Sequence, residues 1–129
     1  MVPSGIAALF ADYADGLNDF DADAIVDLFA FPATVWQFGK GHVFADADEL
    51  LENVEALLAA FDGAGVVTSS FSIRSALQPD GGSSACAAVD WTQENASGEI
   101  IHTFRCAYLL LLDDEQWFIA SVINEPDEA

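Results

Sequence analysis

The sequence contains very few positive charges. Only three of its 129 residues are lysine or arginine, against 22 aspartates and glutamates, so the formal net charge at pH 7 is −19. A surface of this sign repels phosphate backbones and anionic lipid headgroups. We therefore expect neither a nucleic acid nor a membrane as a partner. The acidity itself is typical of a solubilising surface and indicates little about function.

Cysteine and long apolar runs are also scarce. The two cysteines, Cys86 and Cys106, lack the spacing of metal or redox pairs, so we expect both to be reduced. No apolar run approaches the roughly 20 residues that span a bilayer. The N-terminal stretch carries acids and no cationic segment, unlike a signal peptide, which predicts a cytoplasmic protein. Two histidines and scattered acids show no ligand spacing, so we expect no metal or cofactor.

Apolar residues are plentiful and change their period along the chain. They make up 53% of the sequence, enough for one core and a single domain over residues 1–129. Helical periodicity occupies residues 4–20, a short stretch that ends before Pro32, and residues 47–61. Turn residues typical of hairpins separate the expected strands. These strands are residues 34–38, 42–44, 66–78, 84–95, 99–112 and 116–124.

This order places helices on one face of an antiparallel sheet, which is an α+β fold. Two segments then carry a resemblance: residues 13–29 followed by Ala33-Thr-Val35, and the strand of Tyr108 followed by Gln116-Trp-Phe-Ile-Ala. In them the chain resembles the nuclear-transport-factor-2-like superfamily, which includes SnoaL-like polyketide cyclases, ketosteroid isomerase and limonene-epoxide hydrolase. The resemblance implies a cone-shaped, strongly curved, mainly antiparallel sheet packed on about three helices from the N-terminal half, enclosing a pocket.

The turn at Ser97-Gly98 predicts how two long strands pair. If it is a two-residue hairpin, the numbers of facing residues sum to 195. The pairs on one side of the sheet are then Asp90 with Arg105 and Thr92 with Thr103. Those on the other side are Trp91 with Phe104 and Gln93 with His102. The same register sends Cys86 and Cys106 to opposite faces.

The resemblance to the isomerase assigns Arg105 to the concave, pocket-lining face. An arginine withdrawn from water needs an anionic partner, and Asp90 is the obvious one. Arg105 then anchors a carboxylate, enolate or carbonyl of a substrate, unless the two residues form only a self-contained ion pair. Tyr13 matches the hydrogen-bonding tyrosine of the isomerase and would donate to an oxyanion, unless it belongs only to the apolar stripe of its helix. The other side chains expected in the pocket are Trp36, Phe38, His42, Thr103, Ala107, Val122 and Asn124.

The sequence also departs from the enzymes it resembles. The general base of the isomerase falls on Gln37 and its protonated aspartate falls on Ala107, and neither residue can transfer a proton. The epoxide hydrolase matches at Arg105, but its following aspartate is again Ala107. His42 is a candidate base near the pocket mouth, with a surface histidine as the alternative. His102, on the opposite face from Arg105, is expected at an interface.

Two functions remain open. One is a SnoaL-like pocket protein for a small apolar molecule with a carbonyl or carboxylate, with cyclase-, isomerase- or dehydratase-like chemistry through oxyanion stabilisation. The other is a non-catalytic, dimeric protein-interaction or scaffold module. We expect Trp91, Phe104 and Tyr108 on the outer sheet face, where exposed aromatic surface favours a homodimer. The alternative is that the third helix covers these side chains within the monomer.

Overall fold

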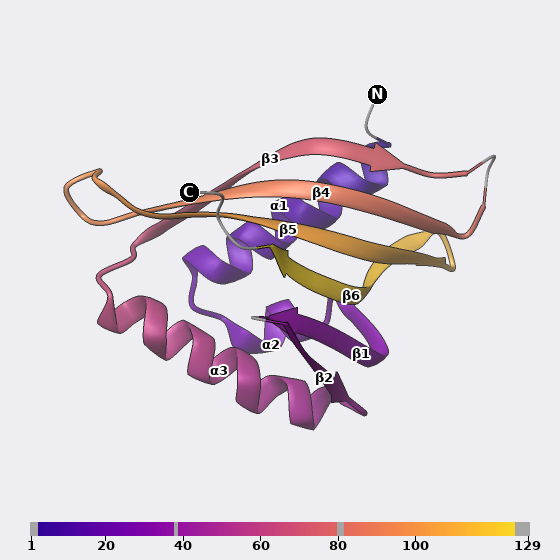
Figure 1. The fold of residues 1–129 in the computed structure, drawn as a ribbon, viewed down its shortest axis with the longest axis horizontal. Coiled ribbons are helices and arrows are strands. Elements are labelled where there is room, and N and C mark those ends of the chain that lie inside the picture. Colours follow the sequence, from indigo (N-terminus) through magenta and orange to yellow (C-terminus); the bar gives the residue numbers. More distant parts are fainter. Residues whose placement is uncertain (1–2, 38, 80–81, 126–129) are drawn as a thin grey trace.

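A computed structural model of the chain describes residues 3–37, 39–79 and 82–125. Its helices and strands follow one another in the order expected from the sequence (Figure 1). The helices are α1 (Ser4–Asn18), α2 (Ala22–Val26) and α3 (Ala47–Gly63). The strands are β1 (Phe29–Gln37), β2 (Lys40–Phe44), β3 (Thr68–Leu77), β4 (Ser84–Glu94), β5 (Ile100–Asp113) and β6 (Gln116–Glu125).

The strands form one curved sheet in the order β2-β1-β6-β5-β4-β3. Each neighbouring pair is antiparallel except β1 with β6, which is parallel. The sheet does not close, since β2 and β3 are its edges. α1 packs on β3 and β6, while α3 packs on α2 and reaches β2. The expected α+β fold, with a curved and mainly antiparallel sheet over three helices, is confirmed.

The second helix ends earlier than the sequence pattern predicts. Leu28 and Phe29 lie beyond α2, and Phe29 already opens β1, where it pairs with Ile119 of β6. The pairing is interrupted after Phe29 and resumes at Thr34. Pro32 lies in this interruption, where its missing N–H costs no ladder hydrogen bond. The apolar residues expected in this helix are therefore buried, although Leu28 and Phe29 lie outside it.

The hairpin between β4 and β5 reaches the predicted register by a different route. The turn has three residues, because the Asn95 N–H donates to the Glu99 carbonyl and the Asn95 side chain accepts from the N–H groups of Ser97 and Glu99. Gly98 has φ +81°, a left-handed conformation that suits glycine. A register shift follows, so that Glu94 faces Ile100 and Gln93 faces His102. The two-residue turn is thus wrong, and the pair sum of 195 holds only because a bulge compensates.

The core lies between the sheet and the helices. On β4, burial alternates with the strand period of two, and the buried residues are Ala85, Ala87, Val89, Trp91 and Gln93. We call this side of the sheet the inner face, and the opposite side the outer face. α3 begins as predicted, because Asp46 accepts from the Glu49 N–H and Glu49 accepts from the Ala45 N–H. None of the described helices is long and apolar enough to cross a membrane.

The contact between α1 and α2 leaves no room for a side chain at Gly16. A Cβ built there would lie 2.8 Å from Ile25 Cγ1, whereas one at Gly63 would meet nothing within 4 Å. We expect Gly16→Val to lower the free energy of unfolding by about 1–3 kcal/mol, because it overpacks this contact. Gly63→Ala, the control, is expected to leave it unchanged or raise it by up to about 1 kcal/mol. Urea unfolding of both variants measures this; equal stabilities would contradict the close-packing argument.

Candidate ligand-binding cavity

A cavity of about 990 Å³ lies between the inner face of the sheet and the helices. α1 contributes Tyr13 and Leu17 to its wall, and α3 contributes several apolar residues from Leu50 to Phe61. The inner face contributes Trp91, Gln93, His102, Phe104, Cys106 and Tyr108. Its wall is mostly apolar with a few polar groups, as in small-molecule sites.

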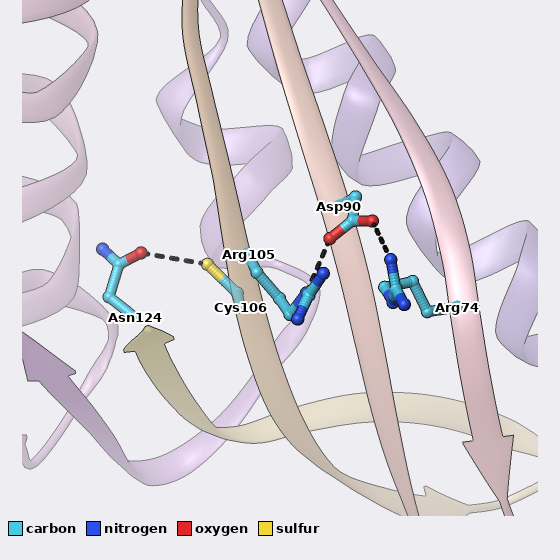
Figure 2. Close-up of polar contacts among 5 residues, drawn as sticks. All are labelled: Arg74, Asp90, Arg105, Cys106 and Asn124. Carbon is cyan, nitrogen blue, oxygen red and sulfur yellow. Dashed lines mark hydrogen bonds and ion pairs between the residues drawn. The ribbon is translucent and has the colours of Figure 1, made fainter. Parts of the chain in front are cut away.

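The predicted pair of Asp90 and Arg105 exists, but it lies on the outer face. Arg105 Nε donates to Asp90 Oδ1 at 2.8 Å, and Arg74 Nη1 donates to Asp90 Oδ2 at 3.0 Å (Figure 2). The hydrogen bond from Arg105, aided by Arg74, holds the pKa of the Asp90 carboxyl below its usual range. The three side chains are between 35% and 53% exposed, so solvent screens their charges.

The register was therefore correct and the face was inverted. Burying Trp91, Phe104 and Tyr108 against the helices removes far more apolar surface from water than burying the opposite face would. The ion pair in turn avoids the cost of desolvation by staying at the surface. Arg105 consequently does not line the cavity and cannot anchor a ligand inside it. No sequence signal pointed to Arg74, which reaches Asp90 from a register shift in β3.

The same inversion relocates the aromatic residues expected at a dimer interface. Trp91 and Tyr108 are 1% and 3% exposed, and both line the cavity together with Phe104. Phe61 of α3 lines the same cavity. The outer-face assignment of these three residues is wrong. Phe10 and Tyr13 of α1 contact Tyr108 and Trp91, so the cover within the monomer comes from α1 as well as from the third helix of the expected alternative, which contributes Phe61 to the same cavity.

The other candidate residues divide between the cavity and the surface. Tyr13, Thr103, Val122 and Asn124 line the cavity. Ala107 does not, because it faces Ala88 and Ile123 on the outer side of the sheet. Trp36 is 48% exposed.

Two candidates expected in the pocket remain, His42 and Phe38. His42 is exposed on edge strand β2, where it faces Val35, and it is not part of the cavity wall. The expected places of Ala107, Trp36 and His42 are thus corrected. Phe38 lies outside the described residues.

Tyr13 lies at the centre of the aromatic wall. Its ring centroid is 5.4 Å from that of Trp91 and 6.5 Å from that of Tyr108. Burial, and next the nearby Cys106, raise the pKa of the Tyr13 phenol, so the hydroxyl stays a proton donor. Within the described ranges of the chain, no residue forms a hydrogen bond with this hydroxyl. Tyr13 therefore has a proton to donate into the cavity.

Two hydrogen bonds join four residues of the inner face in pairs. Trp91 Nε1 donates to the Tyr108 hydroxyl at 2.9 Å, and Tyr108 lies two residues from Cys106 on the same face of β5. Cys106 Sγ donates to Asn124 Oδ1 at 3.2 Å. Figure 2 shows the Asn124 amide oxygen turned toward the sulfur and the amide nitrogen turned away. The bond from Cys106 thus leaves the Asn124 N–H groups as donors.

Charge is nearly absent from the cavity wall. Glu125, at the end of β6, is its one carboxylate among the described residues, and no lysine or arginine of that part of the chain lines it. Across the same ranges, no three His, Cys, Asp or Glu side chains cluster closely enough to hold a metal ion. The cavity therefore offers neutral donors and aromatic surface.

Sequence reasoning missed His102 as a cavity residue. It lines the wall, and its Nδ1 lies 3.0 Å from Oε1 of the buried Gln93. The signal was available in the predicted pairing of these two residues, but the inverted face sent them to the outside.

The sequence and the fold both match known proteins. Residues 4–127 match the family described as NTF2-like protein (DUF6841). The chain belongs to this NTF2-like family. No curated protein matches the sequence. The resemblance to the superfamily drawn from the sequence is thereby confirmed.

Solved structures of low identity share the fold over nearly the whole chain. An NTF2-like protein of unknown function from Shewanella oneidensis MR-1 is 16% identical, with a TM-score of 0.75 over 95% of this chain and 98% of its own. A domain of unknown function with a cystatin-like fold from Nostoc punctiforme has 18% identity and a TM-score of 0.77, covering 98% and 77%. A ketosteroid isomerase-like protein from Erwinia carotovora atroseptica has 20% identity and a TM-score of 0.69, covering 95% and 96%. At these identities the NTF2-like fold alone is shared.

The buried position of Cys106 makes a testable difference between the two cysteines. Cys86 is exposed, whereas Cys106 is buried and both are free. Burial raises the pKa of the Cys106 thiol to about 11. At pH 8 its thiolate fraction is then roughly one in a thousand, and alkylation should be on the order of 100-fold slower than in the denatured chain.

Timed iodoacetamide labelling with mass spectrometry measures this difference. We expect one rapid modification in the native protein, at Cys86, and two in urea. A Cys86→Ser variant is the control and should label only after denaturation. Rapid labelling of native Cys86→Ser would show that Cys106 is reached from solvent.

Proposed function

We propose that this NTF2-like protein binds a small, largely apolar carbonyl compound in its cavity and stabilises negative charge on the carbonyl oxygen. The observation that carries the proposal is the Tyr13 hydroxyl, a cavity-lining donor without a protein partner in the described ranges. A polar group in such a place is suited to fix the orientation of a ligand whose remaining contacts are apolar.

Asn124 supplies a second donor for the same oxygen. Its amide oxygen accepts from Cys106, which leaves both amide hydrogens available on the cavity side of β6. Two neutral donors in a water-poor site stabilise a developing oxyanion more strongly than they would in water. The hydrogen bond from the Cys106 thiol holds the amide in this orientation.

The chemistry that fits this wall is the isomerase or lyase class, in which an enolate-like oxygen gains charge. At the position of the steroid isomerase base this chain has Gln37, whose neutral amide lines the cavity. Any proton transfer would therefore use another group than that enzyme does. The likeness to a ketosteroid isomerase-like protein in fold agrees with a carbonyl ligand and adds no residue-level argument.

Calorimetry with 4-acetylbiphenyl, a rigid apolar ketone, tests the proposal. We expect Tyr13→Phe to weaken binding roughly 2–12-fold, the value of one neutral hydrogen bond of about 0.5–1.5 kcal/mol. Asn124→Leu should weaken it to a similar extent.

Arg105→Leu is the control for this experiment. Arg105 lies on the outer face, so binding of the ketone should be unchanged. Absence of ketone binding by the wild type, or equal affinities for the wild type and Tyr13→Phe, would reject the proposed function. A large loss of affinity in Arg105→Leu would instead indicate that the ligand binds on the outer face.

A homodimer through the outer face remains our proposal, with different residues from those first expected. Leu109 and Leu111 are 42% and 39% exposed on β5, and Ile123 is 46% exposed on β6. Two of the three cations of the chain, Arg74 and Arg105, also lie on this face. Because the chain carries −19 overall, a face that holds two of its three cations is where a second acidic copy meets less repulsion.

Light scattering after size exclusion tests the dimer. Leu109→Asp places an acid in the middle of the exposed apolar residues and should produce a monomer. Val67→Asp is the matched control, because Val67 is 47% exposed but lies in the connection before β3. A monomeric wild type at about 100 µM, well above the Kd of a stable dimer, would reject the interface.

A further inference from the structure

The cavity has a second polar region, formed by Gln93 and His102. Gln93 is fully buried, and its amide bridges two neighbours. Gln93 Nε2 donates to Ser69 Oγ at 3.2 Å, and Gln93 Oε1 lies 3.0 Å from His102 Nδ1. The same three residues belong to adjacent strands, β3, β4 and β5. A row of side chains thus runs across the inner face and ends at the histidine ring.

The buried end of this row is tied to α1. Asn18 Nδ2 donates to the Ser69 carbonyl at 3.1 Å, and the Ser69 N–H donates to Asn18 Oδ1. The Asn18 side-chain amide therefore bonds both the backbone N–H and the backbone carbonyl of Ser69. These two bonds fix the orientation of the amide and the position of edge strand β3 relative to α1. Ser69 is 4% exposed, so its hydroxyl is held in a fixed environment for Gln93.

This row determines which ring nitrogen of His102 carries the proton. Since Gln93 uses its amide nitrogen on Ser69, its oxygen faces the ring and needs a donor. His102 Nδ1 is then protonated, and in the neutral imidazole Nε2 is the acceptor. Within residues 3–37, 39–79 and 82–125, no side chain or backbone group is hydrogen-bonded to Nε2. The ring lines the cavity, so this acceptor is available to a ligand.

We propose that His102 is a second ligand-recognition residue, which accepts a hydrogen bond through Nε2 from a hydroxyl group of the ligand. The inference rests on the proposed function, because Tyr13 and Asn124 hold the carbonyl of the same molecule. The two regions are chemically opposite: one donates hydrogen bonds and the other accepts one. The cavity therefore selects a ligand with a carbonyl at one end and a hydroxyl at the other.

The spacing of the two regions defines the shape of this ligand. His102 is four residues from Cys106 on β5, a separation of about 13 Å along the strand. Phe104 lies between them on the same face, and its ring stacks with Trp91 at a centroid distance of 6.5 Å and an interplanar angle of 19°. A flat, elongated molecule with rings in its middle matches this wall.

The same spacing limits what His102 does. A carbon next to a carbonyl held at Asn124, which contacts Cys106, lies four strand residues from the imidazole, whereas direct proton transfer requires about 3 Å between heavy atoms. His102 is therefore a specificity-determining residue and not the base of an enolisation.

A matched pair of ketones tests the inference by calorimetry. 4-Acetyl-4′-hydroxybiphenyl carries the terminal hydroxyl, and 4-acetylbiphenyl lacks it. We expect the wild type to bind the hydroxylated ketone about 2–12-fold more tightly, the value of one neutral hydrogen bond. His102→Phe should abolish this preference and leave the affinity for the plain ketone within about twofold, since the side chain is exposed at the cavity mouth.

Two conservative variants separate the acceptor from a merely structural role. The amide of glutamine can present an oxygen near the position of Nε2, whereas that of asparagine reaches only the position of Nδ1. His102→Gln should therefore retain part of the preference, and His102→Asn should lose it. In the wild type, ¹⁵N NMR of the neutral ring should show a protonated Nδ1.

The outcomes distinguish the inference from the proposed function. If both ketones bind equally to the wild type, or if His102→Phe keeps the preference, the His102 inference is wrong while carbonyl binding stands. A protonated Nε2 in the neutral ring would also overturn it. If neither ketone binds, the proposed function fails and the inference fails with it.

Discussion

The burial of one aromatic cluster on the inner face determines most of this structure. Trp91 contacts Tyr13, Phe71 and Phe104, and its indole N–H donates to Tyr108. These rings belong to α1, β3, β4 and β5, so one cluster joins the first helix to the sheet. Aromatic side chains bury more apolar surface than any others, and a polar tip such as the Tyr108 hydroxyl can be buried only with a partner. The cluster thus sets both the face that the sheet presents to the helices and the buried hydrogen bond between Trp91 and Tyr108.

That constraint explains why charge and function separate by face. The ion-paired residues Asp90, Arg74 and Arg105 remain in water, where an exposed pair costs little and contributes little. Apart from Glu125 at the end of β6, the described cavity wall keeps neutral polar groups, each with a partner or open to the cavity. None of the sealed side-chain nitrogen or oxygen atoms in the described ranges lacks a hydrogen bond. The cavity is therefore shaped by packing, and its specificity by a few amides, phenols and one imidazole.

The element order and strand register could be predicted from the sequence, because helical and strand periods and turn residues are local signals. The pairing of Asp90 with Arg105 followed from counting alone, although a three-residue turn and a bulge replaced the assumed two-residue turn. Counting residues could not show which face of the sheet is buried against the helices. A charged pair and an aromatic pair alternate equally well along β4 and β5, and only the area buried against the helices decides between them. The match to the isomerase pattern favoured the charged face and so misplaced Arg105 and His102, while Tyr13 and Asn124 reached the cavity.

Under the proposed function, the charge distribution narrows the class of ligand further. A carboxylate would enter a cavity whose described wall holds no cation, on a chain that carries −19. Moving it there would cost its hydration without an ion pair in return, and the surrounding acids would oppose its approach. A neutral ketone loses little hydration and gains the Tyr13 and Asn124 donors. Charge that develops on its oxygen during a reaction would then be stabilised by dipoles already in place, with no arginine needed. A cavity whose described wall has no arginine is therefore consistent with oxyanion chemistry on a neutral substrate. It argues against recognition of a carboxylate.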